Sequence, residues 1–237
     1  MPCNIGYKTY FPIRVPQPQP QTLKQKMPAP TVDKELLEKL GVDDQEFLAW
    51  FQNLDIKPFL KVALEKSLLI ELAGGVNFSI SEEGNIVAES TYLSNSEKLQ
   101  LEEKMNKVLS RWQMEVLKIV TQLLGYDANI QSQSTDGGET IVVVAEEFGK
   151  THPCKYIRIS KDQNGNGEIT FEHFANKQEL EIEKVKFAAL SQKLGVKITI
   201  PSSPITGQPI PGSIEESEKQ HEHGHGHHHR HSHKVKE

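Results

Sequence analysis

The spacing of apolar residues predicts short amphipathic helices over residues 31–73. Apolar side chains recur there at intervals of three and four residues, which is the period of one helix face. Asp43 and Glu46 form an acidic capping box before a run of aromatic residues. Further along, Pro58 falls in the first turn of another expected helix, where its missing N–H is tolerated.

The apolar period then changes to two, which indicates strands. A hairpin is expected over residues 76–88, and a nearly continuous helical stripe predicts the longest helix from about Ser96 to Leu124. A strand is then expected to begin at Ile130. The β-branched run from Thr140 to Ala145 predicts its partner, and Asp136-Gly137-Gly138 supplies the turn between them.

A second unit of the same kind follows. Alternation resumes from Lys155 to Ser160 and, after an NGNG turn, from Glu168 to Phe174. A helix is expected from about Lys177 to Leu194, ended by Gly195, and a last strand from Val196 to Ile200.

Residues 75–130 and 155–200 thus share one order of elements. An internal duplication is one interpretation, and the other is that hairpin–helix units are common. The expected fold class is α+β, with antiparallel β-hairpins packed on two long helices, a small helical N-terminal region and a disordered His-rich C-terminal tail. The expected divisions are an extended Pro-rich arm, a helical region, an α+β domain, and a disordered linker with the tail: residues 1–30, 31–73, 74–200 and 201–237.

Proline sets the character of the first 30 residues. They hold seven of the thirteen prolines, and the PQPQPQ run from Pro16 is expected to be extended, polyproline-like chain. We interpret this run as an arm or linker, with docking into an aromatic groove as the alternative. Tyr7 to Val15 alternates like a strand, and Pro12 restricts that strand to a sheet edge.

Composition excludes several classes of protein. The formal net charge is −5 and the mean hydropathy is −0.50, so nucleic acid is not expected as the main partner. The sequence shows neither a membrane-spanning apolar run nor a signal peptide, and two cysteines cannot build a disulfide framework, so a cytoplasmic location is expected. Phosphate-binding and dinucleotide-binding glycine loops, Gly-x-Ser-x-Gly and HExxH are all missing, which predicts a protein that is not an enzyme.

Histidine is concentrated at the C-terminal end. Eight of the ten histidines fall within thirteen residues, seven of them at alternate positions. Side chains two residues apart lie on the same side of an extended chain, and imidazole suits Zn, Ni and Cu. Interspersed glycines leave the backbone without one fixed geometry, which suits buffering or delivery better than catalysis. The expected metal ligands are His221, His223, His225, His227, His228, His229, His231 and His233.

The tail has other interpretations. A solubilising segment without a specific ligand is one. A purification tag is another, although Glu222, Arg230 and Ser232 interrupt the histidines and favour a native sequence. A pH sensor is a third, because protonation of all ten histidines would change the formal net charge from −5 to +5.

The segment from Asp162 to Phe174 resembles a calcium loop of the EF-hand family. Asp162, Asn164 and Asn166 stand at loop positions 1, 3 and 5 of that family. Position 12, where the family has a bidentate Glu, is His173. The preceding residues alternate like a strand where an EF-hand has a helix. A Gly/Asn hairpin turn is therefore expected here, and calcium binding is not.

Two other groups of residues have alternative roles. His152-Pro153-Cys154 combines a nucleophile with a nearby base, but Pro153 directs the two side chains apart, so a structural role is expected. Cys3, His152 and Cys154 are also alternatives as extra metal ligands. The aromatic segment from Phe47 to Phe51, together with Phe59, is either a docking surface for a partner or part of the core.

These observations predict a cytoplasmic accessory protein that binds a divalent transition metal, Ni or Zn foremost, through the tail. It would buffer the metal or deliver it to a protein partner. The alternative is an adaptor or assembly subunit that acts through its helical face and Pro-rich arm, or by self-association, with the tail incidental. Neither nucleic acid nor a membrane is an expected partner.

Overall fold

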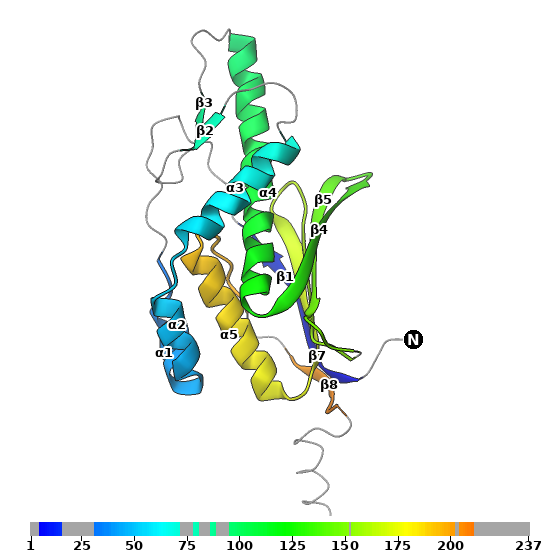
Figure 1. The fold of residues 1–237 in the computed structure, drawn as a ribbon. Coiled ribbons are helices and arrows are strands. Elements are labelled where there is room, and N and C mark those ends of the chain that lie inside the picture. Colours follow the sequence, from blue (N-terminus) through cyan, green and yellow to red (C-terminus); the bar gives the residue numbers. More distant parts are fainter. Residues whose placement is uncertain are drawn as a thin grey trace, which may run out of the picture.

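The computed structural model describes residues 5–15, 31–71, 78–80, 86–88, 95–151, 153–201 and 204–210. In these ranges the chain is an α+β structure, with helices packed on a six-stranded antiparallel sheet (Figure 1). The α+β class and the antiparallel sheet expected from the sequence are confirmed. The Pro-rich run from Pro16 and the His-rich tail lie outside the described residues.

The strands form one large sheet and one small sheet. Four consecutive strands pair as successive hairpins, and the strand nearest the N-terminus is inserted between two strands from the C-terminal half of the chain. The strands of the large sheet, in order across it, are β4 (Tyr126–Thr135), β5 (Gly138–Glu147), β6 (Tyr156–Lys161), β7 (Asn166–Phe174), β1 (Gly6–Arg14) and β8 (Thr206–Gln208). The small sheet pairs β2 (Phe78–Ile80) with β3 (Ile86–Ala88).

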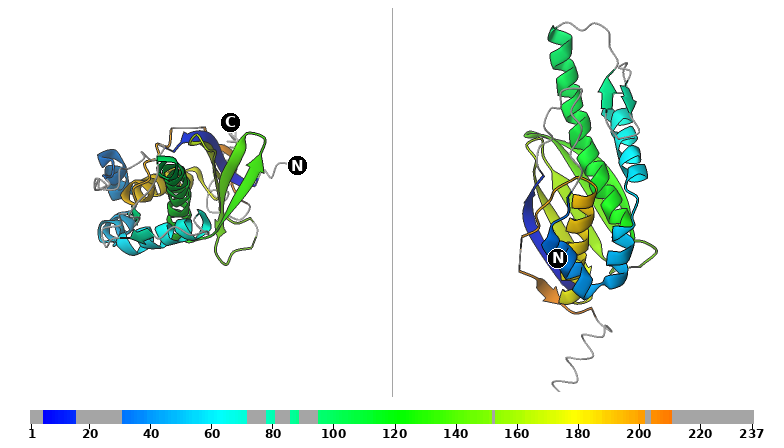
Figure 2. Two further views of the ribbon diagram at one scale, coloured as in Figure 1. Left: turned by 90° about the horizontal axis from the view of Figure 1, so that it is seen from above. Right: turned by 90° about the vertical axis from the view of Figure 1, so that its left-hand side faces the viewer.

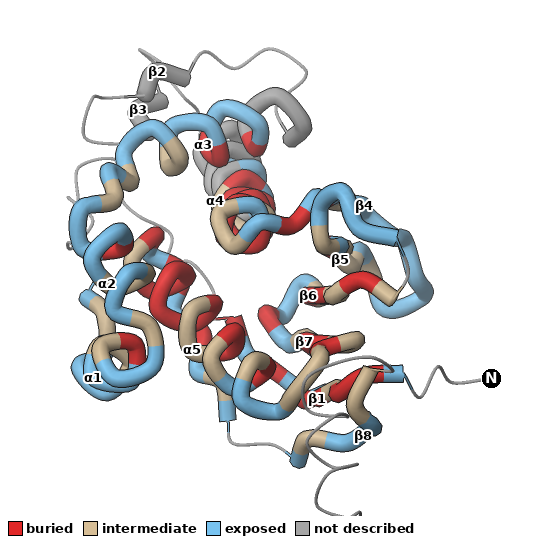
Figure 3. The backbone as a smooth tube through the Cα atoms, turned by 60° about the horizontal axis from the view of Figure 1, so that its bottom comes forward, coloured by how far each residue is buried: buried red, intermediate tan, exposed pale blue. Residues whose placement is uncertain are grey.

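The helices form two layers on one face of the large sheet. The described helices are α1 (Lys34–Asp43), α2 (Gln45–Gln52), α3 (Lys57–Glu71), α4 (Asn95–Leu123) and α5 (Lys177–Lys193). Helix α4 packs on β4 and β5, and α5 packs on β7 and β1. Helices α3 and α1 then pack on the outside of α4 and α5 (Figures 2 and 3).

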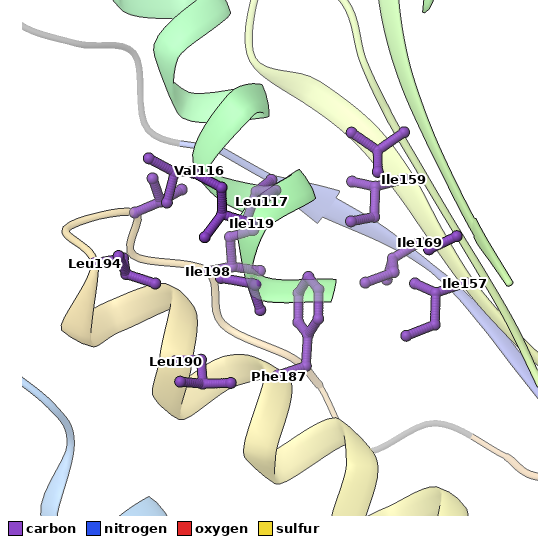
Figure 4. Close-up of a cluster of buried hydrophobic side chains, with 14 of the residues drawn as sticks. Val116, Leu117, Ile119, Ile157, Ile159, Ile169, Phe187, Leu190, Leu194 and Ile198 are labelled. Carbon is purple, nitrogen blue, oxygen red and sulfur yellow. The ribbon is translucent and has the colours of Figure 1, made fainter. Parts of the chain in front are cut away.

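The core lies between the sheet and the α4–α5 layer (Figure 4). Alternate residues of β6 and β7 point into it, because successive side chains of a strand lie on opposite faces. At its centre the Phe171 ring contacts three others, with centroids 6.3 Å from Phe11, 6.3 Å from Phe174 and 5.8 Å from Phe187. Buried aliphatic residues surround these rings: Val116, Leu117, Ile119, Ile157, Ile159, Ile169, Leu190, Leu194 and Ile198.

The strand expected from Val196 to Ile200 is wrong. These residues belong to no strand, although Val196 and Ile198 are fully buried against the core. The Val196 N–H donates to the Ser191 carbonyl in the last turn of α5, and not to a neighbouring strand. Alternation predicted an extended, half-buried chain correctly, but burial alone does not create a pairing partner.

The start expected for β4 at Ile130 is also wrong. The strand begins at Tyr126, directly after Gly125, whose φ of +96° ends α4 and turns the chain into the sheet. Glycine adopts this conformation without the steric penalty of a side chain. The strand therefore includes Asp127 and Asn129, which the hydrophobic pattern alone does not mark.

The proline in β1 lies where an edge was expected. Strand β1 pairs with β7 from Tyr7 to Arg14, whereas β8 covers only Gly6 to Lys8. Among the described residues, Pro12 is therefore on the part of β1 that has no second neighbour, where a missing N–H costs no ladder bond. The expectation that the whole strand from Tyr7 to Val15 lies at an edge is wrong, because β8 covers its first residues.

The proposed duplication stays a prediction. Its two hairpins are both present, but β2 and β3 form their own small sheet, while β6 and β7 lie inside the large one. The helix that follows each hairpin packs on the large sheet in both cases.

Candidate functional site

The predicted metal ligands lie outside the residues that the structure describes. This applies to all eight tail histidines, from His221 to His233, and to Cys3 and His152. Cys154 is described and is buried, with 4% of its surface exposed. Within the described ranges, no group of three or more His, Cys, Asp or Glu side chains is close enough to hold a metal ion.

The EF-hand-like segment forms the β6–β7 hairpin, as expected. Oδ1 of Asp162 accepts hydrogen bonds from the backbone N–H of Asn164, at 2.8 Å, and of Asn166, at 3.0 Å. Gly165 has a φ of +82° and completes the turn. The Asp162 carboxylate therefore closes a turn between two strands, whereas the EF-hand loop lies between two helices.

His173, which aligns with loop position 12, lies far from that turn. Strand β7 runs extended between Asn166 and Phe174, so His173 is about 23 Å from Asn166 along the strand. Its φ of +64° is unusual for a residue with a side chain and coincides with an irregularity in the β1–β7 register. Nδ1 hydrogen bonds to the Ile5 carbonyl at 3.1 Å, and a Cβ on Gly6 would lie 2.9 Å from the His173 Cα. His173 thus helps to attach the start of β1 to β7.

The aromatic segment of α2 is divided between core and surface. Phe51 is buried with 2% of its surface exposed, whereas Trp50 is 40% exposed and Phe47 is intermediate. The Phe47 ring joins them, with centroids 5.3 Å from Trp50 and 6.0 Å from Phe51. The two alternatives for this segment therefore apply to different residues: Phe51 is core, and Trp50 is available at the surface. Phe59, on α3, is intermediate.

Lysines of α5 hold this segment in place. Lys186 Nζ lies 4.8 Å from the Phe47 ring centroid and 2.7 Å from Oδ2 of Asp44. Asp44 also caps α2 by accepting from the Phe47 N–H at 2.9 Å. The hydrogen bond from Lys186 and the one from Phe47 lower the pKa of Asp44. Lys193 donates to the Phe51 carbonyl and lies over its ring, at 4.5 Å.

A cluster of ionisable side chains joins α5 to the end of β5 and the start of β4. Lys155 Nζ is 2.9 Å from Oε1 of Glu179 and 3.9 Å from Oε1 of Glu147. Burial raises the pKa of Glu183, which neighbours Lys155 and the buried Tyr126 hydroxyl. Burial disfavours the Lys155 ammonium, but the hydrogen bond to Glu179 and the nearby carboxylates raise its pKa overall. Burial also raises the pKa of the Tyr126 hydroxyl, so the phenol keeps its proton and does not act as an acid near neutral pH.

A hollow lies between α1 and α5. It has a volume of about 600 Å³, and residues 198–201 form its third side. Gln192 fixes the two helices there, because it accepts from the Asp33 N–H at 2.8 Å and donates to the Asp33 carboxylate at 2.9 Å. Its charged lining contains three lysines and three carboxylates: Lys34, Lys39, Lys184, Asp33, Glu35 and Glu181. This balance of charge favours neither an anionic nor a cationic ligand.

A second hollow of about 220 Å³ lies on the opposite face of the sheet. Strands β1 and β7 and the segment leading to β8 line it. The Tyr10 phenol borders it, and its hydrogen bond to Glu168 raises the pKa of Tyr10. None of the cluster around Lys155 lines either hollow.

Sequence analysis missed the buried lysine at the end of β6. Lys161 is 1% exposed, and its Nζ donates to the Ser110 carbonyl at 3.0 Å and to Oε1 of Gln113 at 2.9 Å. Burial lowers the pKa of Lys161 to about 8. The signal was present in the sequence, because Lys161 has the same parity as the inward-facing Ile157 and Ile159.

Comparison with known proteins places the chain in no family: it matches no protein-family model, no curated protein and no solved structure. Among the helices that the structure describes, none combines the length and the apolar character required to cross a membrane.

Proposed function

We propose that this chain is a non-enzymatic accessory protein that binds a divalent transition metal through its C-terminal tail and brings it to a protein partner. The observation that carries the proposal is the group of eight histidines between His221 and His233. Ni and Zn are the foremost candidates, followed by Cu, because neutral imidazole is a good ligand for all three.

The folded body supplies an attachment point for this tail. Strand β8 pairs with the start of β1 and fixes Gln208 at the edge of the sheet. Thirteen residues lead from Gln208 to His221, so the first tail histidine is at most about 45 Å from this point. This reach includes much of the body's surface, where a bound partner could receive the metal.

The test is calorimetric titration of the full-length protein with Ni²⁺ and with Zn²⁺. We expect binding of more than one ion at about pH 7.5 and at least tenfold weaker binding at about pH 5.5. The reason is that a free imidazole has a pKa of about 6.5 and only its neutral form binds metal. Substituting the eight tail histidines by Gln should abolish this binding.

A matched control keeps the histidines and removes nearby acidic groups. Substituting Glu215, Glu216 and Glu218 by Gln should leave the metal stoichiometry unchanged. Binding that survives the histidine substitutions, or that is equal at both pH values, would contradict the proposal.

A second candidate function is an adaptor or assembly subunit that acts through its helical face and Pro-rich arm, with the tail incidental. The exposure of Trp50 on α2 favours it, as does that of Val42 at the end of α1, which is 85% exposed. Exposed aromatic residues are enriched at the centres of protein interfaces. The acidic neighbours Asp43 and Glu46 would select a partner with basic residues at the rim of its interface.

Adjacent aromatic residues provide the test of this candidate. Trp50→Ala should lower the free energy of unfolding by about 1 kcal/mol or less, whereas Phe51→Ala should lower it by about 3–5 kcal/mol, because only Phe51 fills a buried site. Urea unfolding measures both. If Trp50 is a contact residue, Trp50→Ala also abolishes partner capture or self-association, and a folded variant that associates normally would exclude this role.

A further inference from the structure

We infer that β4 is a self-association edge, through which two copies of this chain join their sheets by pairing their β4 strands antiparallel about a two-fold axis. Strand β4 is the last strand of the large sheet and, among the described residues, pairs only with β5. That pairing runs through all ten positions of β4 without a bulge. Its other edge therefore presents an unbroken row of backbone donors and acceptors.

This edge lacks the features that normally prevent strands from pairing. Proteins protect sheet edges with lysines, prolines, bulges or very short strands. The eight residues from Ala128 to Thr135 contain no charge and no proline. The opposite edge of the same sheet is protected, since β1 has Pro12 and Arg14 there and β8 has only three residues.

Within the part of the chain that the structure describes, this edge is open to a second strand. From Gln131 to Thr135 the side chains on both faces of β4 are exposed. Figure 1 shows the turn end of the β4–β5 hairpin standing clear of the helices. Helix α4 contacts the hairpin from one face of the sheet, with Arg111 Nη1 donating to Ser132 Oγ at 3.1 Å, and does not occupy the edge.

The chemistry of β4 selects a second copy as the occupant. In a two-fold antiparallel pairing, each strand lies opposite itself, so any charge near its centre would face the same charge. With the axis near Gln131, Asn129 faces Gln133 of the partner subunit, and Asp127 faces Thr135 of the partner subunit. Every pair is then uncharged or has a single charge, and the amides and hydroxyls can hydrogen bond across the interface. This interface is independent of the proposed metal binding.

Opposite charges placed at the centre of the strand test the pairing. Full-length protein is expected to be a dimer by sedimentation equilibrium. The double variant Gln131→Lys with Gln133→Lys should weaken the dimer at least tenfold, and Gln131→Glu with Gln133→Glu should do the same, because like charges would then face each other. An equimolar mixture of the two variants should regain wild-type affinity, since a heterodimer brings opposite charges together.

A control and a second measurement complete the test. Thr170→Lys adds a charge to β7 in the centre of the same sheet and should leave the dimer unchanged. In the unmodified protein, hydrogen exchange of residues 126–135 should slow as the concentration rises into the dimeric range. The inference would be overturned if the protein stayed monomeric up to about 100 μM, or if the charged substitutions in β4 left the dimer affinity unchanged.

Discussion

Replacing Glu115 by Leu is expected to lower the free energy of unfolding by about 3–5 kcal/mol, because it leaves a buried guanidinium without its carboxylate. Arg111 and Glu115 lie one turn apart on α4, with Nε 3.4 Å from Oε1, and both side chains are almost fully buried. The same carboxylate also favours the charged form of Lys118, whose pKa is lowered by burial and by the neighbouring Lys66 on α3. Urea unfolding at neutral pH measures the loss.

The double variant Arg111→Met with Glu115→Leu identifies the cause. Removing both charges abolishes the burial of an unpaired ion, so at least half of the lost stability should return. Ser132 loses its donor in this variant, but its side chain is exposed and water can replace the bond. If the double variant is no more stable than Glu115→Leu, the carboxylate acts mainly on Lys118.

A rise of stability in mildly alkaline solution is the second large effect that we expect. Burial lowers the pKa of Lys161 from 10.5 to about 8 in the folded protein. Between these two values the unfolded chain holds a proton that the folded chain has released, so the free energy of unfolding increases with pH. The increase from this lysine is about 3 kcal/mol, complete near pH 10.5, and it is not present below about pH 8.

The variant Lys161→Met isolates this contribution. Other groups titrate in the same pH range, but they do so in both proteins and cancel in the difference. The stability difference between wild type and variant, measured by urea unfolding at pH 8, 9 and 10.5, should shift toward wild type as the pH rises. Parallel pH profiles would mean that Lys161 is not desolvated.

The elements that the sequence predicts well are those whose signal is local. The helical stripe of α4 and the β-branched run of β5 each repeat over many residues, so errors at single positions do not matter. Strand β8 has no such signal, because Thr206, Gly207 and Gln208 are all exposed and held by backbone pairing with β1. Long-range pairing of this kind cannot be read from a short polar segment.

The polar groups of the body show the same division. The alternation of β6 points Lys161 inward. Only the position of α4 determines that Ser110 and Gln113 accept its hydrogen bonds. Lys155, Glu179 and Glu183 come together because α5 crosses the sheet there, which no spacing in the sequence indicates. The tail histidines are the reverse case, since their spacing alone suggests their chemistry and they lie outside the residues that the structure describes.

The place of β1 in the sheet has a consequence for synthesis on the ribosome. Arg14 hydrogen bonds to Asn166 across 152 residues of chain, and the strands around this pair join the first and last parts of the sheet. At about 5–20 residues per second, β1 waits roughly 8–30 s for β7 to be made. Until then β1 lacks this neighbour, and the edge of β6 that later pairs with β7 is open. A chaperone that binds extended segments should therefore contact this protein mostly while residues 15–166 are being translated.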